Sequence, residues 1–177
     1  MSEIKSTLDM VMEKTKHLSL SREEKAAQRT EEIRKTVRGM IQKFKNQLLR
    51  EDRFGEQLEA LEKTYGLNGK RIVKTELLNQ VDINQDNTPL LVLLSDICGE
   101  NVGRIESLLK AHSEKITASR DKRIEKIKDA CSEKYSVSGS AVVPLLENDS
   151  GWAAEAQKIN ETYRKTLNQE KAHMVGG

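Results

Sequence analysis

Histidines and carboxylates at helical spacing are the residues of this chain that could do chemistry. Glu170 and His173 form a Glu-x-x-His pair, the type from which carboxylate-bridged di-iron bundles are built. Such a site needs a second pair of this kind and further carboxylates in the same bundle, and the sequence holds one pair. We therefore interpret the pair as a chance match and rank a helical-bundle metalloprotein third among the function classes.

The other histidines are equally isolated. Glu13 precedes His17 by one helical turn, and Glu114 stands close to His112, without a third group in either case. His112 falls on an apolar helical stripe. An imidazole satisfied by a neighbouring helix is more common there than a catalytic base, so we expect a structural histidine.

The spacing of the cysteines and the lack of recognised catalytic motifs argue against an enzyme. Cys98 and Cys131 match no metal or redox spacing, and we expect two small apolar residues on helix faces. The sequence has no Gly-x-x-x-x-Gly-Lys-Ser/Thr loop and no Gly-x-Ser-x-Gly elbow. We expect no catalysis and no cofactor. Free thiols and the lack of a long apolar run favour a cytoplasmic protein with no membrane contact.

Composition predicts an all-α fold with narrow seams. Charged residues make up 33% of the chain and apolar residues 36%, and there are only six aromatic residues (one Trp, three Tyr, two Phe). Few aromatics suit thin helical seams filled by aliphatic side chains better than a bulky core.

Hydrophobic periodicity and end signals place the helices. The pattern predicts helices over 1–16, 22–65, 70–81, 89–135 and 152–171, with a loop over 136–151. Ser21 and Glu24 have capping-box spacing, Gly66 is a candidate C-cap, and Thr88-Pro89 is typical of a helix start. The stripe of 22–65 repeats every three or four residues; nine of its twelve positions are apolar, and it turns polar at its centre, at Gln47 and Glu51. The 89–135 helix carries Gly99 and Gly103, so we expect a kink or break at 99–103.

Helix lengths then predict an arrangement. Two matched long helices joined by a short connection favour an elongated antiparallel hairpin within a single domain, 1–177. The N- and C-terminal helices would form a bundle at one end, and the short 70–81 helix would cap the other. The waist near Gln47 and Glu51 would bury little apolar surface, so we expect a second copy to pack there as a homodimer.

One stretch of the first long helix is unusually basic. No Asp or Glu occurs from Ile33 to Arg50, and the six basic residues are Arg34, Lys35, Arg38, Lys43, Lys45 and Arg50. They are either a contact surface for an anionic partner, nucleic acid included, or a solvated helix surface. We favour the solvated surface. The lack of aromatic residues for base stacking on the exposed faces argues against sequence-specific RNA binding.

The loop contains an apolar cluster at 141–146. Its Val142, Val143, Leu145 and Leu146 either cover the open end of a helix bundle or form an exposed docking patch for another protein. We favour the covering role. Taken together, the sequence predicts a non-enzymatic helical interaction protein, such as an adaptor, stalk or chaperone-like scaffold, with a protein partner. A nucleic-acid-associated protein that binds through 34–50 is the alternative.

Overall fold

The computed structural model describes residues 21–66, 68–136, 139 and 143–176, and this part of the chain is helical without a strand. The all-α class is therefore confirmed there. The elements are α2 (Arg22–Lys45), α3 (Glu51–Tyr65), α4 (Gly69–Gln80), α5 (Thr88–Asp96), α6 (Gly103–Tyr135), the 3₁₀ turn η1 (Leu146–Asn148) and α7 (Ser150–Gly176). The expected helix over 1–16 lies outside the described residues. No helix in the described part is long and apolar enough to cross a bilayer.

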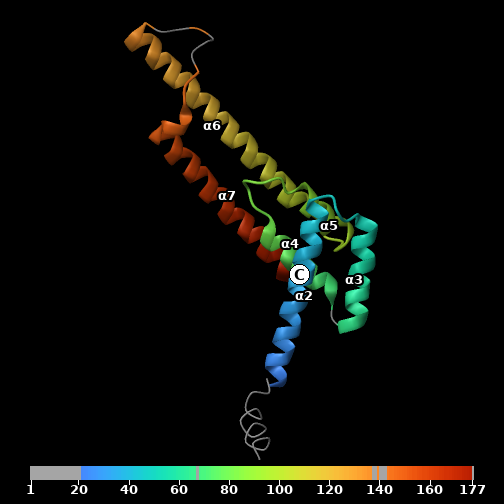
Figure 1. Ribbon diagram of the computed structural model, residues 1–177. Coiled ribbons are helices and arrows are strands. Elements are labelled where there is room, and N and C mark those ends of the chain that lie inside the picture. Colours follow the sequence, from blue (N-terminus) through green and yellow to red (C-terminus); the bar gives the residue numbers. More distant parts are fainter. Residues whose placement is uncertain (1–20, 67, 137–138, 140–142, 177) are drawn as a thin grey trace, which may run out of the picture.

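The molecule has two regions, which we call the body and the arm. Helices α2 to α5 gather into the body, while α6 and α7 run antiparallel to each other and form the projecting arm (Figure 1). The first part of α6 and the last part of α7 pack against the body, and we call these parts the root. The segment that joins α6 to α7 lies at the far end of the arm, the tip (Figure 1).

The body contains most of the buried apolar residues. Its core is formed by all four body helices and the α4–α5 loop, and its fully buried side chains include Val37, Ile41, Phe54, Val73, Leu77, Leu90, Leu93 and Leu94. Leu167 from the root of α7 and Ile105 from the root of α6 join the same cluster. Hydrophobic burial thus fixes the body and the root together.

The predicted continuous helix over 22–65 is wrong, because the chain turns back between Asn46 and Arg50. Gln47 has a left-handed backbone with φ 58°. Its N–H donates to the Phe44 carbonyl (2.9 Å), and the Leu48 N–H donates to the Lys43 carbonyl (2.8 Å). These two bonds form a Schellman motif, which usually contains glycine at the position of Gln47. The turn brings the Phe44 and Phe54 rings edge to face, with centroids 6.2 Å apart.

The predicted hairpin between the two long helices is also absent. The principal partner of α6 is α7, whereas α2 packs on α4, α3 and α5. The expected break at 99–103 does occur, since α5 ends at Asp96, Gly99 has φ 71°, and α6 begins at Gly103. Once α2 turns back on α3, its apolar face is covered within the body, which leaves α6 to pair with α7.

Two smaller predictions also change. The short helix lies at 69–80 as α4, but Val73 and Leu77 are fully buried and it packs on four helices instead of capping an end. The C-terminal helix runs from Ser150 to Gly176 instead of 152–171. It continues because Met174 packs against the core.

Candidate interaction surface

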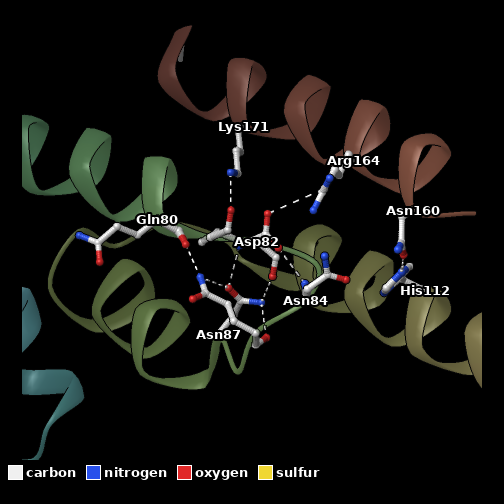
Figure 2. Close-up of polar contacts among 10 residues, drawn as sticks. Gln80, Asp82, Asn84, Asn87, His112, Asn160, Arg164 and Lys171 are labelled. Atoms are coloured by element: carbon white, nitrogen blue, oxygen red, sulfur yellow. Dashed lines mark hydrogen bonds and ion pairs between the residues drawn. The ribbon is translucent and has the colours of Figure 1, made fainter. Parts of the chain in front are cut away.

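The seam of the arm contains a histidine, as expected, held by the neighbouring helix. His112 on α6 is 6% exposed, and its Nε2 lies 2.8 Å from Oδ1 of Asn160 on α7 (Figure 2). The Tyr163 ring lies edge to face against the His112 ring, with centroids 5.2 Å apart. The Tyr163 hydroxyl donates to the Ala111 carbonyl at 3.3 Å. These contacts set the register of α7 on α6, because each polar group has a fixed partner.

A compact loop, Val81 to Asn87, joins α4 to α5 and lies at the root of the arm. Asn87 is 5% exposed, and its Oδ1 accepts from the Asp82 N–H at 3.0 Å. Its Nδ2 donates to the carbonyls of Asp82 (2.7 Å) and Gln85 (3.0 Å) (Figure 2). One buried amide therefore holds both sides of the loop closed, and loss of that amide would leave several backbone groups unpaired.

Helix α7 is tied to this loop by two cations. Lys171 Nζ donates to the Val81 carbonyl, and Arg164 lies 4.0 Å from the Asp82 carboxylate (Figure 2). Burial lowers the pKa of Lys171, and the nearby Asp82 opposes that shift. The root of the arm is therefore attached to the body by side chains as well as by the apolar cluster.

The loop has a spacing that the sequence reasoning missed. Asp82, Asn84 and Asp86 alternate as in the first half of a calcium-binding loop. Here the Asp82 carboxylate accepts from the Asn84 N–H at 2.9 Å, and hydrogen bonds from Thr88 lower the pKa of Asp86. Leu93, fully buried, stands where such a loop needs its bidentate glutamate. The spacing therefore serves a turn, and the described residues contain no group of three or more metal-ligating side chains.

The structure also places the metal candidates, Glu170 and His173, and the two cysteine thiols. Glu170 lies 3.8 Å from Arg104, and His173 is exposed near the end of α7. Burial raises the pKa of the Cys98 thiol to about 11, so this thiol stays protonated at neutral pH and is a poor nucleophile. Cys131 is half-buried on α6, in the arm.

A groove of about 830 Å³ runs between the α4–α5 loop, α5 and α6. Its walls include the apolar side chains of Leu91, Val92, Leu109 and Ile116, and the carboxylates of Asp86, Asp96 and Glu106 stand among its lining residues. His112 also lines it, but the Nε2 of this residue is already engaged by Asn160. The groove offers shape and some negative charge, and on its wall the Ser95 hydroxyl donates to the adjacent Asp96 carboxylate at 2.6 Å.

Two arginines of the predicted basic stretch pair with a carboxylate of another body helix. Arg38 Nε donates to Glu76 at 2.7 Å and its Nη2 to the other carboxylate oxygen at 3.3 Å, while Arg34 lies 3.9 Å from Glu76. Glu76 is 4% exposed, so the two guanidinium groups neutralise a buried carboxylate. The hydrogen bond and the charge of Glu76 raise the pKa of Arg38 further. The sequence could not show this pairing, because Glu76 comes from another helix.

The other four basic residues are less constrained. Arg50 lies 3.4 Å from Asp52 in an exposed pair. Lys35 and Lys43 are exposed on α2, and Lys45 is half-buried near the turn. The basic stretch is thus divided between two half-exposed arginines that pair with the buried Glu76 and four side chains without such a buried partner.

The tip of the arm exposes apolar side chains. Val143 is 78% exposed, Leu145 is 73% exposed and Tyr135 is 63% exposed. Leu146 is 8% exposed, and the 3₁₀ turn that contains it packs against α7, whereas Val142 lies outside the described residues. Among the described residues of the cluster, burial agrees with the preferred covering role for Leu146 and not for Val143 or Leu145. Tyr135 was not among the predicted site residues.

A cross-arm ion pair fixes the chain beside the tip. Arg123 on α6 donates from Nε (3.0 Å) and Nη2 (2.8 Å) to the two carboxylate oxygens of Asp149. Asp149 also accepts from the Trp152 N–H and so caps the start of α7. The hydrogen bond from Arg123, followed by that from Trp152, lowers the pKa of Asp149. The start of α7, which follows the exposed Val143 and Leu145, is therefore joined to α6 by side chains.

No known protein family, curated protein or solved structure matches this chain.

Proposed function

We propose that the chain is a non-enzymatic helical interaction protein, an adaptor or scaffold of the cytoplasm, that holds a protein partner at the tip of its arm. The observation that carries the proposal is the exposure of Val143 and Leu145 beside a closed seam. Exposed apolar side chains that cluster on a rigid support are typical of protein-binding surfaces.

The polar groups of the molecule support a non-enzymatic role. His112 is engaged by Asn160, Glu170 stands beside Arg104, and the Cys98 thiol is held protonated by burial. These candidates for acid–base, metal and thiol chemistry are thus each paired with another side chain or held in an unreactive state. A catalytic site would need at least two such groups directed at one substrate position.

Nucleic-acid binding through the basic stretch 34–50 is the second candidate. Because Arg34 and Arg38 pair with Glu76, their charges are less available to a nucleic acid. Lys35 and Lys43 are among the exposed residues of the stretch that would contact phosphates. A gel shift with duplex DNA at low salt, lost with salt and with Lys35→Glu plus Lys43→Glu, would favour this candidate over the tip.

The tip is tested with a double substitution, Val143→Ser plus Leu145→Ser. The immobilised chain retains partner proteins from its native cell extract, and mass spectrometry identifies those that the double variant no longer retains. Affinity of the purified partner should fall at least about tenfold, as for central interface residues. The melting temperature should not change, because both side chains are exposed.

The matched control is Val175→Ser, which removes a half-exposed valine near the end of α7, at the other end of the arm. It should retain the partner at full affinity. Equal retention by the tip variant and the wild-type chain would contradict the proposal. A large fall in melting temperature would instead assign Val143 and Leu145 a covering role.

A further inference from the structure

The turn between α2 and α3 is unusual because nothing in its composition stops a helix. Residues 46–50 are Asn, Gln, Leu, Leu and Arg, with neither glycine nor proline. Gln47 nevertheless has a left-handed backbone, φ 58°, which residues with a Cβ rarely adopt. The same five residues would fit a continuous helix without backbone strain.

The turn also leaves an apolar side chain without a partner. In a Schellman motif the residue at the position of Leu48 usually packs against the preceding turn of the helix. Leu48 is instead 76% exposed. In a straight helix it would lie two turns beyond the fully buried Ile41, on the same edge of the apolar stripe.

The buried faces of α2 and α3 share one heptad phase. The steps from Phe44 to Gln47, Glu51 and Phe54 are three, four and three residues, so the register passes through the turn without a shift. Ile33 and Val37 before the turn and Phe54 and Leu58 after it are all buried. If 22–65 became one straight helix, these residues would form one apolar face.

A single chain cannot bury that straight face. With the turn at 46–50 in place, α2 packs on α3, α4 and α5 of the same chain. In a straight helix Phe44 and Phe54 would lie about 15 Å apart, so their ring contact would be lost within the chain. A second copy in the same state presents the complementary surfaces, namely its own α3, α4 and α5.

We propose that two copies of the chain associate by exchanging α2. In this dimer, residues 22–65 form one helix in each copy, and α2 of one copy packs on the body of the other. The Phe44–Phe54 contact and the Arg38–Glu76 ion pair then form between copies. Leu48 lies near the two-fold axis, where the second copy covers it. The exchange uses none of the tip residues, so it stands apart from the proposed function.

The first experiment compares Gln47→Gly with Gln47→Ala. Glycine favours the left-handed turn and disfavours the helix, whereas alanine does the reverse. Because both chains of the dimer change, the dimer dissociation constant should be lower for Gln47→Ala by about 100-fold or more. Light scattering across a concentration series measures it. One chain mass for both variants at every concentration would overturn the proposal.

The second experiment tests whether Arg38 and Glu76 meet between copies. Arg38→Glu alone and Glu76→Arg alone each place like charges across the α2–α4 contact. When the two variants are unfolded, mixed and refolded, an exchanged dimer contains one wild-type pair and one reversed pair. We expect the mixture to recover the melting temperature of the wild-type chain. The dimers isolated from it should contain the two variant chains in equal amounts.

The double variant Arg38→Glu plus Glu76→Arg is the control, because its chain carries the reversed pair by itself. It should be about as stable as the best mixture and form dimers of its own. If the mixture melts no higher than the two separate variants while the double variant is restored, α2 stays on its own body and the proposal is wrong. Val143→Ser plus Leu145→Ser should leave the dimer mass unchanged, which keeps this test distinct from that of the tip.

Discussion

The body and the arm are both helical, but they are held together by different kinds of contact. Leu77, Leu90 and Leu93 in the body are fully buried by other apolar side chains. Along the seam of the arm, buried His112 and Ser119 occur beside apolar Ile159. Apolar packing gives the larger stabilisation, whereas hydrogen-bonded polar groups fix one register. The difference indicates a stable body that carries an arm with a defined but more easily opened seam.

The largest expected effect is in the body core. Leu93→Ala removes a fully buried side chain from α5 and should lower the free energy of unfolding by about 3 kcal/mol. Urea titration followed by far-ultraviolet circular dichroism measures the loss. Leu145→Ala, at a 73% exposed leucine in the tip, is the matched control and should stay within about 0.5 kcal/mol of wild type. Similar losses for the two leucines would remove the distinction between body and tip.

An intermediate effect is expected where the two regions join. Asn87→Ala removes the amide that closes the α4–α5 loop and should cost about 2 kcal/mol, because buried backbone groups lose their partners. Hydrogen exchange should also become faster in the last turns of α7, which Lys171 ties to this loop. Asn84→Ala, at an exposed position in the same loop, is the control. Unchanged exchange in α7 would mean that the loop does not hold the arm.

The smallest expected effect is an acid transition in the arm. The pKa of folded Asp149 is below its ordinary value of 3.8, so its ionised form stabilises the arm above that value. The contribution is lost as the pH falls through the lower, folded-state pKa. Trp152 is the one tryptophan of the chain and follows Asp149, so its fluorescence reports this region.

The control for the acid transition is Asp149→Asn, which cannot ionise. Its Trp152 emission should already be altered at neutral pH and should show no further acid step. Far-ultraviolet circular dichroism of the wild-type chain should keep the body signal over the same pH range. Simultaneous loss of both signals would mean that the arm and the body open as one unit.

Local signals in the sequence predicted much of the helical pattern. Ser21 accepts from the Glu24 N–H at 3.1 Å and Glu24 accepts from the Ser21 N–H at 2.7 Å, as the capping-box spacing indicates. Gly66 has the expected left-handed backbone at the end of α3. Such end signals depend on residues within one turn of each other, so they can be recognised without knowledge of the tertiary structure.

The missed features depend on contacts between distant segments. The turn at Gln47 contains neither glycine nor proline, and the heptad spacing of the stripe continues through its polar positions Gln47 and Glu51. The choice of α7 as partner of α6 depends on what covers α2, and the Arg38–Glu76 pair joins two helices. Of the candidate site, the end of α6 at Tyr135 agrees with the predicted boundary, but α7 begins at Ser150 and not at 152. The separation of exposed Val143 and Leu145 from buried Leu146 was not predicted. Periodicity assigns a residue to a helix face without identifying the neighbour of that face.

The arm gives the molecule a mechanical property. At 33 residues, α6 is about 50 Å long, and α7 returns alongside it to the body. A partner that pulls on the tip along the arm would stretch both helices in parallel, with the tension carried to the root. A sideways pull would instead act through the full length of a lever on the contacts of Lys171 and Arg164 with the α4–α5 loop. The chain should therefore resist axial force far better than transverse force.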